Sequence, residues 1–79
     1  MNGQTSIDTT LVRDGDNTYR VLDADGFTLG WVEKWYERDS VNNTGVPRFA
    51  ARPLGVHVHR YDCLSVSSAV AYIRGALGR

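Results

Sequence analysis

Short segments of alternating apolar and polar residues run through most of the chain, and a longer stretch with helical spacing ends it. The alternation covers residues 18–22, 27–36, 48–52 and 56–59. Alternation over such lengths predicts half-buried β-strands, because successive side chains of a strand point to opposite faces of a sheet. We therefore expect an α+β fold in which a three- to four-stranded antiparallel sheet packs against one C-terminal α-helix.

The stretch with helical spacing covers residues 65–77. Its apolar residues recur along one face, and they are Val66, Ala69, Val70, Ile73 and Leu77. Ser65 is a suitable N-cap, because its hydroxyl can accept a hydrogen bond from the backbone N–H of Ser67 or Ser68. The pattern predicts one amphipathic helix that lies across the sheet.

Turn-forming residues separate the predicted elements. Residues 23–26 favour a hairpin turn, residues 37–47 form a polar loop, and residues 53–55 form a second tight turn. Residues 1–17 are polar with few apolar side chains, and we interpret them as a flexible N-terminal lead or a short edge strand. Residues 18–79 then form a single sheet-plus-helix binding domain.

The helix decides which way the last two predicted strands face, because the sheet face that packs on it must be apolar at every second position. Phe49 and Ala51, together with Val56 and Val58, satisfy this requirement. Their neighbours must point away from the helix, and these are Arg48, Ala50, Arg52, His57, His59 and Tyr61. The sequence therefore predicts an exposed basic face.

The strand at 27–36 can be oriented in two ways. Its odd-numbered positions include both tryptophans, whereas its even-numbered positions include Val32. A bulge at Gly30 would turn Leu29 and Val32 towards the core together. In either orientation a large aromatic residue stays near the surface, and we expect at least one tryptophan to be buried.

The charges of the chain cancel overall but are uneven along it. Nine basic and nine acidic residues give no net charge, so the molecule lacks the broad positive field of a protein that coats nucleic acid or an anionic membrane. Residues 1–40 hold eight acidic and four basic residues, whereas residues 41–79 hold one acidic and five basic residues. Basic residues of the second half are therefore the candidates for contact with an anionic partner.

Several classes of function find little support in the residues. Cys63 is the single cysteine, no secretory signal opens the chain, and no apolar stretch approaches the ~20 residues of a membrane-spanning helix, so we expect a cytoplasmic protein. His57 and His59 share one predicted strand face, but a closed zinc site needs about four ligands, so we predict no metal and no cofactor. No serine or cysteine stands beside a base in a recognisable motif, and we predict no enzyme activity.

The order of motifs in residues 19–77 resembles a known family. The pattern Phe49-x-Ala51, then Gly55, an alternating strand, and Ser65-x-x-x-Ala69-Val70-x-x-Ile73 is similar to the three-stranded sheet and helix of plant ethylene-response-factor type DNA-binding domains. The amino-terminal domains of tyrosine integrases are similar as well. In that family the exposed sheet face lies in the major groove of DNA. The resemblance implies DNA contacts by Arg48, Arg52, His57 and His59, with Trp31 or Lys34 added from the preceding strand.

The chain differs from this family in its charge, and it is also similar to a second group of proteins. The family is usually more basic overall, and two of the matching positions here are histidines, which carry little charge at neutral pH. The chain is also similar to small bacteriophage proteins with four strands and a helix. Its eight arginines against one lysine favour a GC-rich, actinobacterial or actinophage source, in which case the protein works in the cytoplasm of a bacterial host.

These observations predict a small non-enzymatic binding domain with one of two partners. The first partner is duplex DNA, bound through the exposed sheet face by Arg48, Arg52, His57, His59 and Lys34. The alternative is a protein interaction, with a host protein or in a homodimer, through an unpaired sheet edge or through Trp31, Trp35 and Tyr36.

Overall fold

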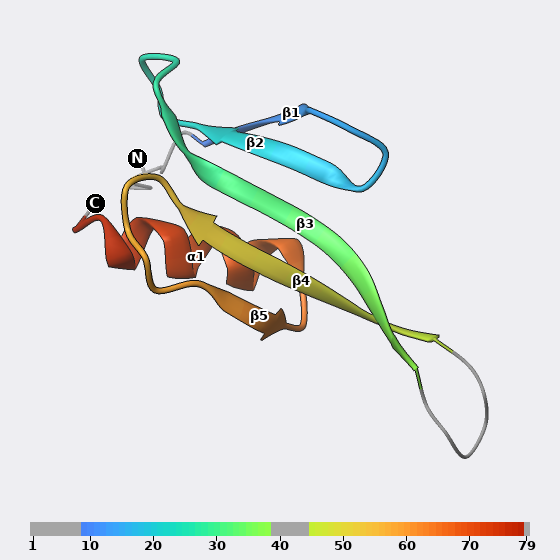
Figure 1. Ribbon diagram of the computed structural model, residues 1–79. Helices are drawn as coiled ribbons and strands as arrows, with labels where there is room; N and C mark the ends of the chain where they lie inside the picture. Colours follow the sequence, from blue (N-terminus) through green and yellow to red (C-terminus); the bar gives the residue numbers. More distant parts are fainter. Residues whose placement is uncertain (1–8, 39–44, 79) are drawn as a thin grey trace, which may run out of the picture.

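A computed structural model describes residues 9–38 and 45–78 of the chain, and in these residues it contains five strands and one helix (Figure 1). The elements are β1 Thr10–Arg13, β2 Thr18–Leu22, β3 Thr28–Arg38, β4 Gly45–Pro53, β5 Arg60–Cys63 and α1 Val66–Ala76. The strands form one antiparallel sheet in chain order, β1-β2-β3-β4-β5. The predicted α+β fold is confirmed, with one strand more than the three to four expected, because residues 10–13 also pair.

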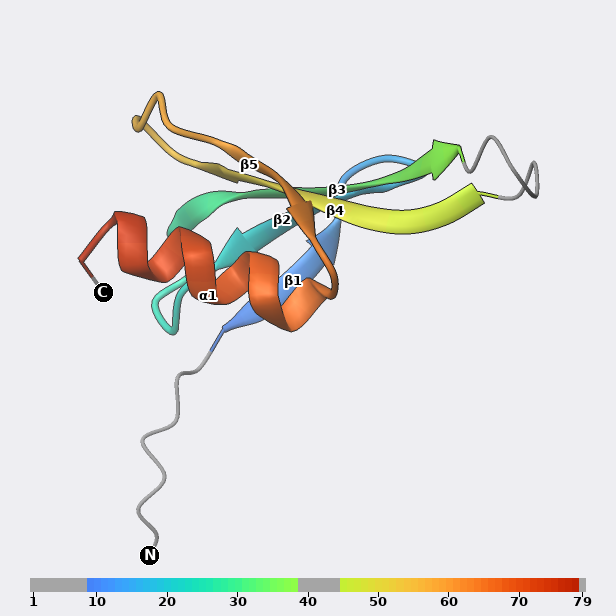
Figure 2. The same cartoon turned by 90° about the horizontal axis from the view of Figure 1, so that it is seen from below.

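Helix α1 lies across one face of the sheet and packs mainly against β4 (Figure 2). Its N-cap is Ser65, whose hydroxyl accepts a hydrogen bond from the Ser68 backbone N–H at 3.1 Å, as the sequence predicted. The core between helix and sheet consists of Val21, Leu29, Val32, Ala51, Cys63, Ala69 and Ile73. No helix in the described part of the chain is long and apolar enough to cross a membrane.

The hairpin of β2 and β3 is built as the sequence indicates. The Asp23 carboxylate accepts hydrogen bonds from the backbone N–H groups of Asp25 and Phe27, both at 2.9 Å, which holds the turn. Further along, the register shifts: Val21 pairs with Gly30, whereas Leu22 pairs with Thr28. The extra residue, Leu29, is a β-bulge, and it turns Leu29 and Val32 into the core together. The sequence left two orientations of this strand open, and the structure has the one with a bulge, which lies beside Gly30 at Leu29.

Strands β3 and β4 form a long arm that extends beyond both β5 and the helix (Figure 1). Their pairing runs from Gly30 and Pro53 to Arg38 and Gly45. The predicted loop at 37–47 is therefore too long at both ends, because its first two and last three residues continue the ladder; residues 39–44 lie outside the described residues.

The predicted strand at residues 56–59 is wrong. Residues 54–59 form an irregular connection, and β5 begins at Arg60. As a result Val58 is 65% exposed and does not face the helix.

Two prolines give the physical reason. The Leu54 N–H donates to the Leu29 carbonyl of β3 at 2.9 Å. Because ladder donors alternate in direction along a strand, the odd-numbered residues of β4 direct their nitrogens towards β5. Pro47 and Pro53 have no N–H to donate there. Pairing with β5 is therefore confined to residues 49–51, between the two prolines.

Candidate functional site

The sheet face opposite α1 carries most of the residues that the sequence singled out. We call it the open face, because no element of the described chain covers it (Figure 2). In the β3–β4 register Trp31 stands opposite Arg52, and Trp35 stands opposite Arg48. The open face comprises Arg20, Trp31, Glu33, Trp35, Glu37, Arg48, Ala50 and Arg52.

Glutamates of β3 neutralise both arginines of β4 on this face. The Arg52 Nη2 atom lies 2.6 Å from Glu33 Oε1, and the Arg48 Nε atom lies 3.2 Å from Glu37 Oε1. Partly exposed pairs of this kind contribute at most about 1 kcal/mol to stability. They do offset positive charge, so the two arginines of β4 do not form a purely basic surface.

The side chain of Trp35 connects β3 to β5 across the open face. Its indole Nε1 donates to the Tyr61 carbonyl of β5 at 2.7 Å, so the ring crosses over β4 to reach the second strand away. Ala50 of β4 is only 1% exposed although it points to this face. The small side chain of Ala50 leaves room for the ring, and the indole ties β5 to the sheet.

Neither tryptophan belongs to the core, so the expectation of a buried tryptophan is wrong. Both rings are half-buried on the open face. The bulge at Leu29 is the reason, because it gives the inward positions of β3 to Leu29 and Val32 and leaves Trp31 and Trp35 outward.

Lys34 and Tyr36 lie on the opposite side of β3 from the arginines. They share the parity of Val32, which faces the helix, and Lys34 stands opposite Phe49. The Lys34 Nζ atom lies 5.3 Å from the centre of the Tyr36 ring, and Tyr36 is 57% exposed. The prediction that Lys34 joins the basic face is therefore wrong in its geometry.

The two histidines lie in the irregular connection before β5, outside the β3–β4 ladder that carries the arginines. His59 Nδ1 is 3.3 Å from the Tyr61 hydroxyl, and the two rings meet edge to face. The Tyr72 hydroxyl of α1 donates to the Val58 carbonyl at 3.3 Å, which holds this connection beside the helix. Of the five predicted nucleic-acid contacts, the ladder register places Arg48 and Arg52 on one face and Lys34 on the other, whereas His57 and His59 have no ladder position.

Sequence reasoning missed Arg20, which stands opposite Trp31 on β2. Its Nη2 atom is 3.9 Å from Asp14 Oδ1, and its Nε atom is buried without a hydrogen-bond partner among the described residues. Counting back from the turn at 23–26 would have placed Arg20 near Trp31. The partners Glu33 and Glu37 were missed because the β3–β4 register depends on a loop whose length the sequence left open.

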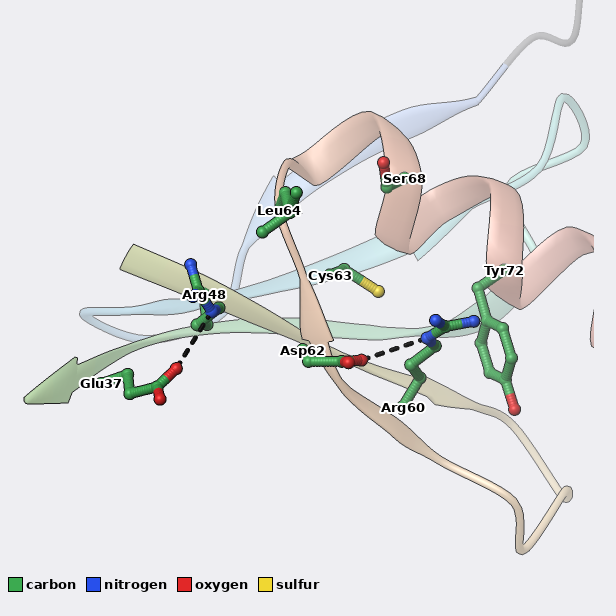
Figure 3. Close-up of a pocket in the computed structure, with 8 residues that line it drawn as sticks. All are labelled: Glu37, Arg48, Arg60, Asp62, Cys63, Leu64, Ser68 and Tyr72. Carbon is green, nitrogen blue, oxygen red and sulfur yellow. Dashed lines mark hydrogen bonds and ion pairs between the residues drawn. The ribbon is translucent and has the colours of Figure 1, made fainter. Parts of the chain in front are cut away.

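A groove lies where the β3–β4 arm, β5 and α1 meet (Figure 3). This groove has a volume of about 610 Å³. Its lining consists of Glu37, Arg48, Arg60, Asp62, Cys63, Leu64, Ser68 and Tyr72. Arg60 Nε donates to Asp62 Oδ1 at 3.1 Å. This hydrogen bond and the opposite charge lower the pKa of Asp62, so two arginines and two carboxylates balance in the groove.

Cys63 forms part of the groove floor and of the core. Burial raises the pKa of its thiol, which keeps the sulfur protonated at neutral pH and makes it a weak nucleophile. Among the described residues, no group of three or more His, Cys, Asp or Glu side chains could hold a metal ion. Comparison of the chain with protein-family models, with curated proteins and with solved structures finds no match.

Proposed function

We propose that this chain is a small non-enzymatic domain that binds a protein partner through its open face. One observation carries the proposal: the half-buried ring of Trp31 lies between Arg20 and Arg52 on a face that no described element covers. The centres of protein interfaces are enriched in tryptophan and arginine and poor in lysine, and this face has that composition.

The charge balance of the open face supports a protein partner more than a polyanion. Glu33 and Glu37 already occupy the two arginines of β4. A protein surface with charges of both signs can exchange these contacts for its own, whereas phosphates would meet two carboxylates at the same place. If the chain is phage-encoded, as its resemblance implies, the partner is a host protein of the bacterial cytoplasm.

Duplex DNA is the second candidate, because three guanidinium groups lie on one uncovered face. Arg20, Arg48 and Arg52 are all on the open face, and guanidinium groups can pair with guanine edges in the major groove. Binding of this kind would require the β4 arginines to leave their glutamates.

Two measurements separate these candidates. The first is a fluorescence-anisotropy titration of random-sequence duplex DNA at about 50 and 200 mM salt, the range in which phosphate contacts reveal themselves. The glutamate-free variant Glu33→Gln/Glu37→Gln is titrated in parallel. A DNA reader binds at low salt, weakens steeply with salt, and binds several-fold more tightly once the carboxylates are gone.

The second measurement is capture of host proteins on immobilised wild-type protein at both salt concentrations. We expect a partner that is retained at 200 mM salt, is lost with Trp31→Ala, and is kept by the control Val58→Ala, whose exposed side chain belongs to the connection before β5 and not to the β3–β4 ladder. A partner that survives Trp31→Ala contradicts the proposal. Steeply salt-dependent DNA binding without such a partner would favour the second candidate.

A further inference from the structure

Charged side chains are sorted between the two sides of the sheet. Within strands β1 to β4 the acidic residues are Glu33 and Glu37, and both belong to the open face. On the side that faces α1, which we call the helix side, the same strands carry Arg13 and Lys34. Neither of these cations forms an ion pair with a described residue. The helix side therefore holds positive charge that the sheet does not neutralise.

Two tyrosines alternate with these cations along a diagonal of the sheet. Arg13 stands opposite Tyr19, and its guanidinium carbon lies 6.0 Å from the centre of that ring. Tyr19 stands opposite Val32, so Lys34, two residues further along β3, is its diagonal neighbour. The Lys34 Nζ atom lies 5.3 Å from the centre of the Tyr36 ring. We call Arg13, Tyr19, Lys34 and Tyr36 the tyrosine–cation strip.

The strip lies beside α1 and not beneath it. The helix packs on β3, β4 and β5, and both the β1–β2 hairpin and the β3–β4 arm extend beyond its first turn (Figures 1 and 2). Gly45 makes room for Tyr36, because a Cβ atom on Gly45 would lie 3.1 Å from Cβ and 3.2 Å from Cδ1 of Tyr36. The tyrosine therefore rests against the backbone of β4 while its side chain stays exposed.

Arg13 is held in place by the turn that follows it. Its Nε atom donates to the Gly15 carbonyl at 3.2 Å, and its Nη2 atom donates to the Asp16 carbonyl at 2.9 Å. Both acceptors are neutral backbone groups, whereas the neighbouring Asp14 carboxylate turns to Arg20 of the open face, at 3.9 Å. The Arg13 charge is thus fixed beside Tyr19, with N–H donors left over for an anion.

We propose that the tyrosine–cation strip binds single-stranded nucleic acid. Bases would stack on the rings of Tyr19 and Tyr36 while phosphates contact Arg13 and Lys34, the combination by which proteins bind single strands without reading their sequence. Four residues of β3 separate Tyr36 from Val32, which stands opposite Tyr19, so the two tyrosines are roughly 13 Å apart along the sheet. This distance leaves room for an intervening nucleotide whose phosphate meets Lys34.

The chemistry of the strip selects this ligand over other anions. A duplex keeps its bases stacked inside, so only its phosphates could contact the strip. An acidic protein segment would pair with the cations but would offer the two rings no regularly spaced flat partners. The proposal is independent of the open face, because the two surfaces lie on opposite sides of the sheet.

Fluorescence anisotropy of a labelled oligothymidylate of about 12 nucleotides tests the proposal. We expect micromolar binding at about 50 mM salt and a slope of about −1.4 in a plot of log K against log salt, because two cations contact phosphates. An unlabelled duplex of the same length and polyglutamate should each compete at least about tenfold more weakly than the unlabelled single strand. Equal competition by either of them would overturn the proposal.

Variants assign the binding to the strip. Lys34→Gln should weaken binding several-fold and make the slope shallower by about 0.7, whereas Tyr36→Ala should weaken it at least about fivefold without changing the slope. Arg48→Gln removes the same charge from the open face, and Tyr61→Ala removes an exposed tyrosine outside the strip, so both should bind as wild type. Binding that survives in folded Lys34→Gln and Tyr36→Ala, or that is lost in Arg48→Gln, would contradict the assignment.

Nuclear magnetic resonance of the wild-type protein gives a readout that needs no variant. On addition of the oligothymidylate, the ring signals of Tyr19 and Tyr36 should shift upfield, whereas the indole signals of Trp31 and Trp35 should stay in place. Shifts confined to the indoles, or no binding at about 1 mM protein, would overturn the proposal. Trp31→Ala, which tests the open face, should bind the oligothymidylate as wild type does, so failure of the open-face proposal and failure of this one are distinguishable.

Discussion

Gly30 allows β3 to pass close to the backbone of β4. A Cβ atom at this position would clash with the Arg52 carbonyl oxygen and lie 3.0 Å from Pro53 Cα. Both neighbours are backbone atoms of the strand that carries the arginines of the open face, so they cannot move aside without shifting β4. The absence of a side chain at Gly30 thus allows the close spacing of β3 and β4. The neighbouring bulge at Leu29 determines which face of the sheet both tryptophans point to.

We expect Gly30→Ala to lower the free energy of unfolding by about 2–4 kcal/mol, because β3 and β4 must separate locally. Gly75→Ala is the matched control: no atom lies within 4 Å of its added Cβ, and it replaces glycine inside α1. The control should raise the free energy of unfolding by about 0.5–1 kcal/mol. Urea denaturation measures both, and a Gly30→Ala protein as stable as wild type would contradict the close approach.

Cys63 predicts how stability depends on alkaline pH. Burial raises the pKa of its thiol, so the folded state favours the protonated form. The resulting stabilisation is complete below the pKa of the unfolded thiol, about 8.5, and is lost as pH rises through the higher folded pKa. The free energy of unfolding of wild type should therefore fall more than that of Cys63→Ala as the pH rises above about 8.5. Parallel slopes in urea titrations of the two proteins would rule this out.

At the scale of elements, local signals predicted the hairpin and the helix, whereas the β4–β5 junction could not be predicted. The turn at 23–26 and the cap at Ser65 act within a few residues, so they can be recognised along the sequence. Pro53 has no N–H, and whether the missing donor would face β3 or β5 depends on the register of β4 with β3. The apolar–polar alternation of residues 56–59 carries no information about that register.

The candidate site divides in the same way. Arg48 and Arg52 are four residues apart in one strand and therefore lie on the same face, so the sequence could group them correctly. Their partners Glu33 and Glu37 belong to another strand, and only the register brings them together.

The link between Trp35 and β5 can be tested by removing the indole donor while keeping an aromatic ring. Trp35→Phe loses the hydrogen bond to the Tyr61 carbonyl, and we expect a loss of about 1–3 kcal/mol in the free energy of unfolding. Trp31→Phe is the control on the same strand and face, and it should cost less. Chemical denaturation compares the two, and equal losses would show that the indole bond contributes little.

At the scale of the whole molecule, one helix covers one face of a five-stranded sheet, and no element of the described chain covers the other face. The core contains three large, fully buried side chains, Val21, Val32 and Ile73. A core this small provides a modest margin of stability.

The β4–β5 ladder is confined between Pro47 and Pro53, and this short ladder determines which part of the native molecule opens first. The β3–β4 ladder spans the full length of the arm, whereas β5 is attached at two ladder positions, by the Trp35 indole and by its packing on α1. Strand β5 and its connection can therefore swing away as a cooperative unit while the hairpins before it stay folded. Each local opening of β5 exposes the Cys63 thiol to solvent. The rate of alkylation of Cys63 under native conditions therefore reports how often this edge of the sheet opens.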